Sequence, residues 1–421
     1  MEDSASSGGS SSTFGLMKIG VVREGKVPPD QRVPLTPAQC AELKRLYPEV
    51  ELVVQASEVR RIADEEYRAE GIEVVNVLEG CDVLLGVKEV PTAELIPDTT
   101  YLFFSHTYKL QPYNAKLLRA IVDKRIRLID YELIKRTNGR RVIGFGRWAG
   151  IVGAYNGLRA WGLRHGTFEL PRAIDCSDMK DMIGEAKAID LPANMKIVLT
   201  GGGRVGMGAH ELLSALGLRE VHGEAFLKEQ FNEAVFTRLD VDQYNKRRDG
   251  QPFDMDEFIE DPTEFISTFM PYAKVADMYI AGHYWAEGSP FLFTREDMKH
   301  PEWNVRVVAD VSCDIDGPVA CTLRPSTIAE PLYGYDPHSE SECGFNAPEG
   351  ITVMAVDNLP CELPRDASHG FGKEMMAHVM PLIVGGDRDD MLTNATETTL
   401  DGRLAPKFAY LQNYIDSASV D

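Results

Sequence analysis

The stretch from Ile197 to Gly206 is the feature that most restricts the fold of this chain. Its sequence is IVLTGGGRVG, an apolar run followed directly by the pattern G-x-G-x-x-G and then by a predicted helix. A buried strand that enters a helix through such a loop is typical of dinucleotide-binding domains, because the glycines form the tight turn, admit the pyrophosphate and let the helix pack on the strand. We therefore predict cofactor contacts from the loop, with an ordinary tight turn as the alternative; the residues are Gly201, Gly203, Arg204, Val205 and Gly206.

An acidic residue about 20 positions after the glycines is expected to bind the adenosine ribose. Glu224 lies 21 residues after Gly203, whereas Asp240 in VFTRLDVDQY follows a segment that resembles a strand end. Either carboxylate would accept a hydrogen bond from the ribose 2′-OH and repel a 2′-phosphate. No arginine cluster is evident nearby, so we predict NAD as cofactor, with NADP possible. The alternative is that both acids are solvated surface groups.

Apolar runs alternate with predicted helices along the first part of the chain. The runs are MKIGVV, VELVVQ, CDVLLGV, TYLFFSH and IRLIDYE, and similar runs return later in VADMYIAGHYW, NVRVVADVS and ITVMAVDNLP. Continuously apolar strands separated by helices are typical of parallel sheets covered on both faces. We predict an α/β fold with doubly wound sheets.

The order of these signals suggests two domains. Residues 1–16 are rich in Ser and Gly, and we expect a disordered tail there. Residues 17–150 together with 368–421 form the predicted substrate domain. Residues 151–367 form the predicted dinucleotide-binding domain, and the acidic, aromatic segment near 220–272 is expected to be an insertion.

Charge and cysteine usage restrict the partners. The chain has 44 Lys and Arg against 65 Asp and Glu, a net charge of −21, which disfavours nucleic acid and anionic membranes as partners. An anionic substrate therefore requires a local basic pocket. The seven cysteines show no C-x-x-C pair and no metal-ligand spacing, so we expect no disulfide framework, no metal site and a reducing, cytoplasmic location. Whether the chain is a monomer or a homo-oligomer stays open.

Polar residues follow three apolar runs of the first domain. Lys88 and Glu89 come after LLGV, His106 and Lys109 lie in FSHTYK, and Glu132 comes after LIDY. The carboxyl ends of neighbouring parallel strands border one crevice, so we expect these side chains to converge. A lysine and a histidine supply an acid and a base that burial and nearby charge can tune. The alternatives are an ion-paired lysine and a core histidine.

Arginines add positive charge to the same domain. Arg32, in DQRVPLTP, is suited to clamp a carboxylate through two donors, although a structural salt bridge is an equal alternative. Arg140, Arg141 and Arg147 lie close in sequence to Phe145. With the lysines, these arginines form the predicted basic pocket.

Two segments of the second domain end in turn-forming residues. Asp310 follows one apolar strand, and Asp357, Asn358 and Leu359 follow another. We expect both segments to border the nicotinamide. The alternative is plain turn chemistry, in which Asp and Asn are common.

Taken in order, the motifs resemble those of the alanine dehydrogenase and lysine-forming saccharopine dehydrogenase superfamily. The motifs are REGKVPPDQRVPLTP, LLGVKEVP, LFFSHTYKLQ, LIDYELI, GRRVIGFGRWAG, the glycine loop, VADVSCDIDG and VDNLPCELPRDAS. FSHTYK, AGHYW and DGRLAPKFAYLQNYI are most similar to the lysine–ketoglutarate reductase half of aminoadipic semialdehyde synthase. The saccharopine dehydrogenase half of that enzyme is not recognised in this sequence.

The resemblance implies a fold and residue roles. It implies two Rossmann-type domains with the active site in the cleft between them. The positions matching Lys88 and His106 form the acid–base pair, and the position matching Arg32 binds a substrate carboxylate. The positions matching Lys109, Glu132 and Arg141 line the same pocket, and Asp310 and the 357–359 loop match segments that approach the cofactor. We also expect Glu89 and Phe145 to contact the substrate.

The implied reaction is the reversible, NAD(P)H-dependent condensation of L-lysine with 2-oxoglutarate to saccharopine. Saccharopine carries three carboxylates, and several cationic side chains suit that number better than the single carboxylate of alanine. Alanine dehydrogenase is the first alternative. A catalytically silent dinucleotide-binding protein is the second, since a fold does not imply an activity.

Overall fold

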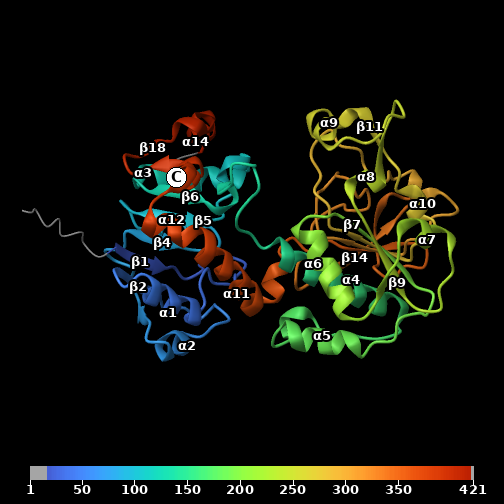
Figure 1. Cartoon of the computed structure of the whole chain (residues 1–421), viewed down its shortest axis with the longest axis horizontal. Helices are drawn as coiled ribbons and strands as arrows, with labels where there is room; N and C mark the ends of the chain where they lie inside the picture. The colour runs from blue at the N-terminus through green and yellow to red at the C-terminus, as the bar shows by residue number, and fades with distance from the viewer. Residues whose placement is uncertain (1–16, 419–421) are drawn as a thin grey trace, which may run out of the picture. The chain divides into compact units, whose positions relative to one another are not determined.

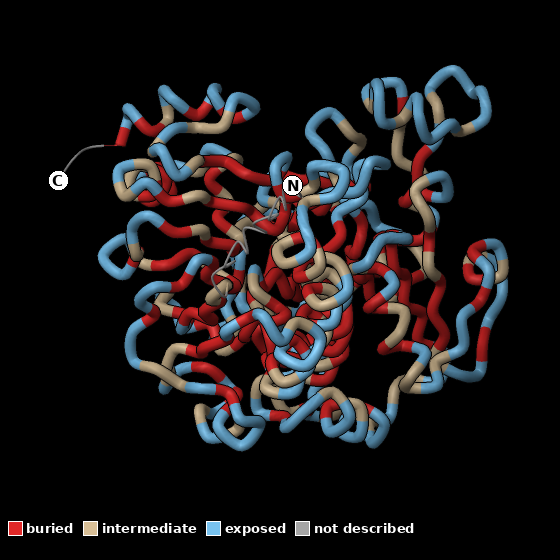
Figure 2. The backbone as a smooth tube through the Cα atoms, turned by 60° about the vertical axis from the view of Figure 1, so that its left-hand side comes forward, coloured by how far each residue is buried: buried red, intermediate tan, exposed pale blue. Residues whose placement is uncertain are grey.

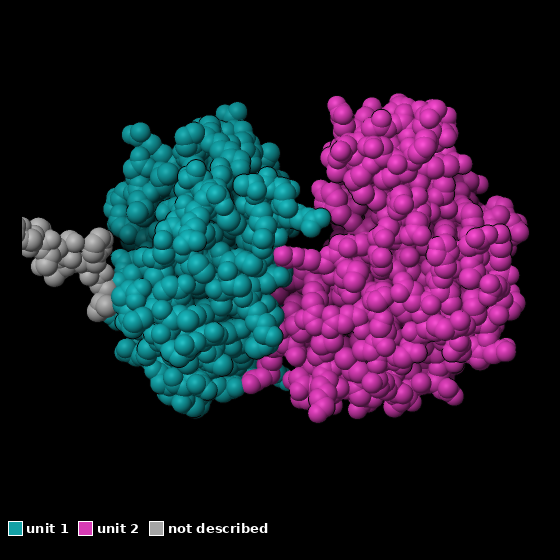
Figure 3. Space-filling view, viewed as in Figure 1, with its two compact units in different colours: residues 1–144, 368–421 teal, residues 145–367 magenta. Residues whose placement is uncertain are grey.

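The computed structural model describes residues 17–418, so the predicted disordered tail lies outside the described part of the chain. The chain divides into two compact units, residues 1–144 with 368–421 and residues 145–367 (Figure 3). The predicted boundary at residue 150 is therefore slightly wrong. It falls inside helix α4 (Gly146–His165), which belongs entirely to the second unit.

The first unit is built on a six-stranded sheet in the order β3-β2-β1-β4-β5-β6. Each neighbouring pair of strands is parallel. This order is that of a doubly wound dinucleotide-binding sheet. The strands are β1 (Met17–Val21), β2 (Val50–Gln55), β3 (Glu73–Val75), β4 (Val83–Leu85), β5 (Thr100–Phe103) and β6 (Arg127–Asp130).

Helices of the N-terminal and the C-terminal segments lie beside this sheet (Figure 1). Apolar side chains of α3 pack with those of the sheet and of the C-terminal segment in one core, whose members include Leu84, Leu118 and Leu411. The elements are α1 (Pro37–Leu46), α2 (Asp64–Ala69), α3 (Ala115–Asp123), α11 (Pro364–Glu374), which belongs to this unit from Ser368 onward, a π-helical turn (Met375–Val379), α12 (Met380–Gly385), α13 (Met391–Asn394), β17 (Thr398–Thr399), β18 (Arg403–Leu404) and α14 (Gln412–Asp416).

The second unit has an eight-stranded sheet in the order β15-β14-β16-β13-β12-β7-β9-β8. The run from β16 to β8 is parallel, whereas β14 is antiparallel to both of its neighbours. Both sheets confirm the predicted α/β, doubly wound fold. The strands are β7 (Lys196–Thr200), β8 (Arg219–Glu220), β9 (Val235–Leu239), β12 (Met278–Ala281), β13 (Val307–Asp310), β14 (Leu332–Asp336), β15 (Ser341–Cys343) and β16 (Ile351–Met354).

Glycines allow two helices of this unit to touch. A Cβ on Gly150 of α4 would lie 1.9 Å from the carbonyl oxygen of Val205, and one on Gly208 of α6 would lie 2.0 Å from that of Arg147. The glycines of the long helix α4 therefore let its backbone approach that of α6 closely. The other helices are α5 (Met179–Lys187), α6 (Arg204–Ala215), α7 (Gly223–Lys228), α8 (Val241–Tyr244), α9 (Met255–Glu260) and α10 (Met270–Ala273).

The predicted insertion near 220–272 needs correction. Its range contains β9, a buried strand that pairs directly with β7 in the main sheet. The extra structure is confined to a small hairpin of β10 (Asn245–Arg247) and β11 (Phe265–Ser267) with α9 between them. The prediction took the acidic composition of the whole range as the sign of an insertion and so overlooked β9, a regular strand of the main sheet.

Buried residues gather in the interior strands and helices, and exposed ones in the outer loops (Figure 2). Within residues 17–418, no helix is both long and apolar enough to cross a membrane. The same residues contain no group of three or more His, Cys, Asp and Glu side chains arranged to hold a metal ion. Cys40 and Cys321 are buried free thiols, and burial raises the pKa of Cys40 to about 12.

Candidate functional site

In the first sheet, strands β1 to β3 are added toward one edge, and strands β4 to β6 are then added on the other side of β1. The order of the strands therefore reverses between β1 and β4. In open parallel sheets, ligands bind at this reversal point, beyond the carboxyl ends of the strands. The loop after β1 carries Glu24 and Lys26, and the loop after β4 carries Lys88 and Glu89. These two loops therefore frame the candidate site of the first unit.

A row of oppositely charged groups runs along this edge. The Lys26 Nζ lies 2.8 Å from Glu89 Oε2, and Glu89 Oε1 lies 3.3 Å from His106 Nδ1. On its other side, His106 Nε2 lies 4.0 Å from Glu132 Oε2. These residues follow β1, β4, β5 and β6, which are adjacent strands, so the predicted convergence is present. We call this row, together with Lys109 and Arg141, the strand-end charge network.

Glu132 has two cationic partners. Its carboxylate lies 2.8 Å from Lys109 Nζ and 2.6 Å from Arg141 Nη2. Burial acts to raise the pKa of Glu132, but these two cations outweigh it and the pKa is lowered. In Glu89 burial is likewise outweighed by hydrogen bonds from His106 and Lys26, which hold the pKa at about 2. Both carboxylates are thus ionised at neutral pH.

Lys88 differs from its neighbours. Among the residues that the structure describes, no carboxylate lies within ion-pair distance of its ammonium, although the side chain is half-buried. Burial, together with repulsion from Arg32 and Lys26, lowers its pKa. A lysine whose pKa is brought toward neutrality can exchange a proton with a reacting group. The predicted alternative, an ion pair between Lys88 and Glu89, does not form.

Glu24 supports the backbone of this loop. Its carboxylate accepts hydrogen bonds from the amides of Val87 (2.7 Å) and Lys88 (3.0 Å). Burial and the nearby charge of Asp30 raise its pKa to about 8. Glu24 therefore holds the backbone of Val87 and Lys88, just after β4, in place.

Arg32 is engaged by an acid of its own loop. Its Nε and Nη2 lie 3.0 Å and 2.6 Å from the two oxygens of Asp30, and both side chains are 2% exposed. Such a buried, two-point pair is the structural alternative considered for Arg32. The arginine still contributes positive charge near Lys88.

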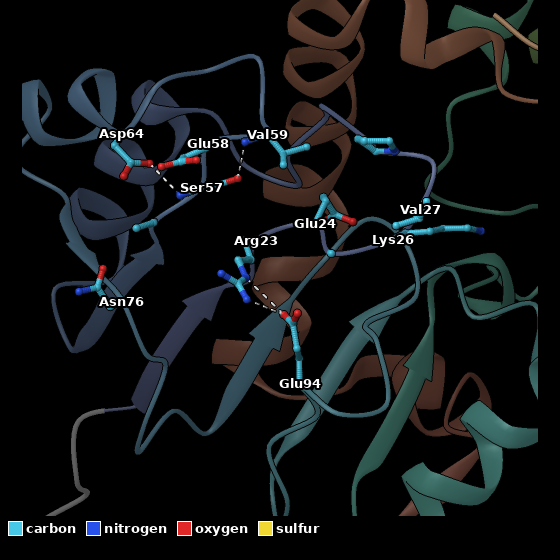
Figure 4. Close-up of a pocket in the computed structure, with 13 residues that line it drawn as sticks. Arg23, Glu24, Lys26, Val27, Ser57, Glu58, Val59, Asp64, Asn76 and Glu94 are labelled. Atoms are coloured by element: carbon cyan, nitrogen blue, oxygen red, sulfur yellow. Dashed lines mark hydrogen bonds and ion pairs between the residues drawn. The ribbon is translucent and has the colours of Figure 1, made fainter. Parts of the chain in front are cut away.

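Two cavities adjoin the strand-end charge network. The larger, about 680 Å³, lies over the ends of β1, β2 and β3 and is lined by both cations and anions, among them Arg23, Lys26, Glu94 and Asp64 (Figure 4). The smaller, about 340 Å³, is more apolar and includes Glu89, Val90 and Leu117. Lys26 lines both cavities.

In the second unit, the glycine loop lies at the corresponding reversal point, between β7 and β12. Gly201 has φ +111°, and a Cβ there would lie 2.5 Å from the Gly282 carbonyl oxygen. A Cβ on Gly206 would lie 2.0 Å from the Gly201 carbonyl oxygen, whereas one on Gly203 would meet open space. The loop is thus tight where the backbone packs and open at the N-terminus of α6, where a phosphate would approach. Arg204 and Val205 form the first turn of α6.

The two candidate ribose acids are placed differently. Asp240 directly follows β9, the neighbour of β7, and a Cβ on Gly202 would lie 2.3 Å from its Oδ1. Glu224 lies on α7, after the edge strand β8, and pairs with Lys228 at 2.6 Å. Of the two acids, Asp240 is therefore the one that lies beside the glycine loop. Among the described residues, a single arginine, Arg238, pairs with Asp240.

The other predicted cofactor residues have mixed placements. Asp310 is fully buried, and its carboxylate accepts hydrogen bonds from Ser312, Cys313 and Thr322, so its contacts fit the turn-forming alternative. Asp357 is exposed and Asn358 half-buried after β16, while Leu359 belongs to the core.

Phe145 is separated from the other predicted substrate residues by the division of the chain. It belongs to the second unit, immediately before α4, whereas the strand-end charge network belongs to the first. The structure of the first unit therefore groups Lys88, Glu89, His106 and Glu132 without Phe145.

Sequence reasoning missed several residues of these sites. Lys26 and Glu24 lie in a charged turn that signals only a loop, and Arg238 lies inside the supposed insertion. Asp130 was overlooked because it lies within the apolar run LIDY. Glu397 was overlooked because it is 292 residues from its partner Ser105 in the sequence. A search for charged residues after every strand end would have found Lys26, but no local signal identifies Glu397.

Comparisons with known proteins agree with this architecture. Residues 20–152 match the alanine dehydrogenase/PNT N-terminal domain family. Alpha-aminoadipic semialdehyde synthase is 29% identical in Mus musculus, over 92% of this chain and 47% of the relative, and 27% identical in Arabidopsis thaliana, over 93% and 41%. The chain thus spans about half the length of these relatives. The saccharopine dehydrogenase [NAD(+), L-lysine-forming] of Schizosaccharomyces pombe is 26% identical over 79% of this chain and 84% of the relative.

Solved structures support the fold. An L-alanine dehydrogenase superposes with a TM-score of 0.64 at 18% identity, covering 95% of this chain and 99% of that one. The transhydrogenase of Sinorhizobium meliloti superposes with a TM-score of 0.58 at 17% identity, covering 93% and 100%.

Proposed function

We propose that this chain is a nicotinamide-dependent oxidoreductase that joins L-lysine to 2-oxoglutarate, giving saccharopine, because residues 20–152 match the alanine dehydrogenase/PNT N-terminal domain family and the chain is similar along most of its length to aminoadipic semialdehyde synthases. The observation that carries the proposal is the placement of Lys88 and His106 after the adjacent strands β4 and β5, beside the reversal point of the first sheet. Lys88 lacks an ion-pair partner among the described residues, whereas His106 lies between the carboxylates of Glu89 and Glu132. This arrangement supplies two proton-exchanging groups with different surroundings.

The chemistry requires both groups. The ε-amine of lysine attacks the keto carbon only after it loses a proton, so a base must accept that proton. The resulting carbinolamine loses its hydroxyl as water, so an acid must donate a proton to that oxygen. Lys88 Nζ and the His106 ring nitrogens exchange these protons in the proposed reaction. A bound reduced nicotinamide supplies the hydride for the imine.

The strand-end charge network favours zwitterionic substrates. Lysine carries an ammonium and a carboxylate on the same carbon, and 2-oxoglutarate carries two carboxylates. Glu89 and Glu132 alternate with Lys26, Lys109 and Arg141, so both signs of charge are available along one edge. A ligand with both signs can exchange partners with such a row without leaving a charge unpaired.

The glycine loop is suited to hold the dinucleotide. Gly203 leaves open space at the N-terminus of α6, and the tight packing at Gly201 and Gly206 fixes the turn. Asp240 would accept a hydrogen bond from the ribose, which favours NADH, with NADPH as the alternative because Arg238 stands beside it.

The test is a panel of NADH and NADPH oxidation rates. The acceptors are 2-oxoglutarate and pyruvate, and the donors are lysine, ornithine and ammonia. We expect turnover with lysine and 2-oxoglutarate, with saccharopine as the product by mass spectrometry. Turnover confined to pyruvate and ammonia would replace the proposal with alanine dehydrogenase, and dinucleotide binding without turnover of any pair would support a catalytically silent protein.

A further inference from the structure

Two carboxyl groups are buried together beneath the His106 loop. Asp130, which ends β6, and Glu397, from the C-terminal segment, are both fully buried, as are Ser105 and Thr107 between them. Ser105 Oγ lies 2.6 Å from Asp130 Oδ2 and 3.0 Å from Glu397 Oε1. Thr107 Oγ1 lies 2.7 Å from Glu397 Oε2 and 2.6 Å from Ser105 Oγ.

These contacts require more protons than the hydroxyls possess. Four oxygen–oxygen contacts join the four side chains, and two hydroxyl groups supply a proton to only two of them. A proton on Glu397 supplies a third. Within residues 17–418, neither carboxyl forms an ion pair with a Lys, Arg or His side chain, so no such pair compensates a second buried negative charge.

The same group of side chains determines the backbone at His106. Asp130 Oδ2 accepts hydrogen bonds from the amides of Ser105 (2.8 Å) and His106 (3.2 Å). His106 itself has φ 55°, a left-handed conformation that a non-glycine residue holds only when its surroundings enforce it. The direction of the imidazole therefore depends on the position of Asp130.

Glu397 reaches this position through ordinary pairing of its segment with β6. The Glu397 amide donates to the Leu128 carbonyl at 2.8 Å, and Thr398 Oγ1 donates to Ile126 and accepts from the Leu128 amide. Pairing of the C-terminal segment with β6 thus places the Glu397 carboxyl against Ser105 and Thr107, the residues on either side of His106.

We propose that Glu397 is a positioning residue for His106, and that in its neutral form it completes the hydrogen-bonded group with Ser105, Thr107 and Asp130 that holds the His106 backbone. This inference rests on the proposed function for its catalytic consequence. The effect on the loop itself is independent of any substrate.

The surroundings of Glu397 give the inference a pH dependence. Burial and the charge of Asp130 raise the pKa of Glu397 to about 8, against the hydrogen bonds from Thr107 and Ser105. Burial also raises the pKa of Asp130. Glu132 and four tyrosines also interact with these two carboxyls, and none of them supplies a positive charge at neutral pH; the tyrosines are Tyr108, Tyr131, Tyr410 and Tyr414. Above about pH 8 we expect Glu397 to ionise and the loop to loosen.

The first test compares two substitutions. Glu397→Gln keeps one acceptor and one donor and so imitates the neutral acid, whereas Glu397→Ala removes both. At pH 7 we expect kcat of the glutamine variant to match wild type and kcat of the alanine variant to fall about 10- to 100-fold, as misplacement of a catalytic group does. NADH affinity should be unchanged in both. A glutamine variant as slow as the alanine variant would overturn the proposal.

The second test needs no turnover. In protein labelled with ¹⁵N-histidine, the His106 backbone amide is assigned by its absence from a His106→Asn variant. We expect this resonance to move as the pH rises through about 8 in wild type and to stay fixed in Glu397→Gln. Equal movement in both proteins, or none in wild type, would overturn the proposal. If the resonance behaves as expected while no substrate pair is turned over, the positioning role stands and only the proposed reaction fails.

Thr398→Val is the matched control. It removes hydrogen bonds that attach the same segment to β6 but touches neither Ser105 nor Asp130. We expect a lower melting temperature with the wild-type pH dependence of the His106 amide. A changed pH dependence in this variant would show that the attachment of the segment, rather than the Glu397 carboxyl, controls the loop.

Discussion

The two units have related sheets but use the carboxyl edges of these sheets in opposite ways. In the first unit the edge is occupied by long charged side chains, which form a row from Lys26 to Arg141. In the second unit the edge at β7 is nearly bare, because three successive glycines follow the strand. One edge therefore offers side-chain protons and charges, and the other offers backbone amides and space.

This difference shows what each edge can contribute. Side chains with lowered or raised pKa values suit proton transfer, and an open glycine loop at a helix N-terminus suits phosphate. A mutation should thus affect chemistry at the first edge and cofactor binding at the second.

The largest expected effect is at the first edge. Lys88→Met and His106→Gln should each lower kcat about 10²- to 10⁴-fold while leaving NADH affinity near that of wild type, because each removes one proton-exchanging group. The double variant should lose much less than the product of the two losses. Steady-state rates and calorimetric titration of NADH measure both quantities.

Lys246→Met, on the exposed hairpin of the second unit, is the control for loss of a lysine. It should leave kcat unchanged. If His106→Gln turned over at nearly the wild-type rate, His106 would be a core histidine, and the first edge would not be the catalytic one.

At the second edge, Gly203→Val should weaken dinucleotide binding at least about 100-fold without unfolding the chain, because the side chain occupies the space through which the pyrophosphate reaches the backbone. Gly184→Val makes the same change in open space on α5 and should bind normally. Calorimetry and circular dichroism report binding and folding. Undiminished cofactor affinity in Gly203→Val would remove this loop from the cofactor site.

A smaller change concerns cofactor choice. We expect wild type to prefer NADH, because Asp240 lies beside the glycine loop and its ion pair occupies the Arg238 guanidinium, which could otherwise bind a 2′-phosphate. Asp240→Asn should raise the ratio of kcat/KM for NADPH to that for NADH about tenfold, since it frees the guanidinium for a 2′-phosphate. Glu224→Gln, which alters the other acid, should leave the ratio unchanged. The opposite result would place Glu224 at the ribose.

The last prediction concerns stability. The pKa of Glu89 is about 2 in the folded chain, below its ordinary value, so its ionised form stabilises the fold above about pH 4.5 and this contribution is lost as the pH falls toward 2. Glu89→Gln should therefore cost about 2 to 3 kcal/mol near pH 7. The deficit should shrink below about pH 4.5. Urea unfolding at pH 7 and pH 4 measures this difference, and a deficit that stays constant with pH would mean that the charge of Glu89 contributes little. Glu79→Gln, at an exposed site, is the control.

Several features of this molecule follow from local sequence. The glycine loop could be predicted because turn, open space and helix start are all encoded within ten adjacent residues. Lys88, His106 and Glu132 could be predicted because each directly follows an apolar strand, and parallel strands end at one edge. These inferences need only short-range geometry and the rule that places strand ends together.

Other features depended on contacts between distant segments. The sequence spacing favoured Glu224, but pairing of β9 with β7 brings Asp240 to the glycine loop. Arg32 is a possible ligand clamp by residue type, yet folding of its loop directs it to Asp30. Spacing along the chain measures distance in sequence, whereas hydrogen bonding between strands determines distance in space.

Glu397 shows this limit most clearly. Nothing in TETTLDG distinguishes it from a solvated surface acid, and only the attachment of its segment to β6 buries it beside Asp130 and Ser105. By itself the sequence determined the doubly wound fold, the glycine loop and the order of polar strand ends. The tertiary structure decided which of these polar groups are paired, buried or exposed, because burial and ion pairing depend on what the rest of the chain places around each group.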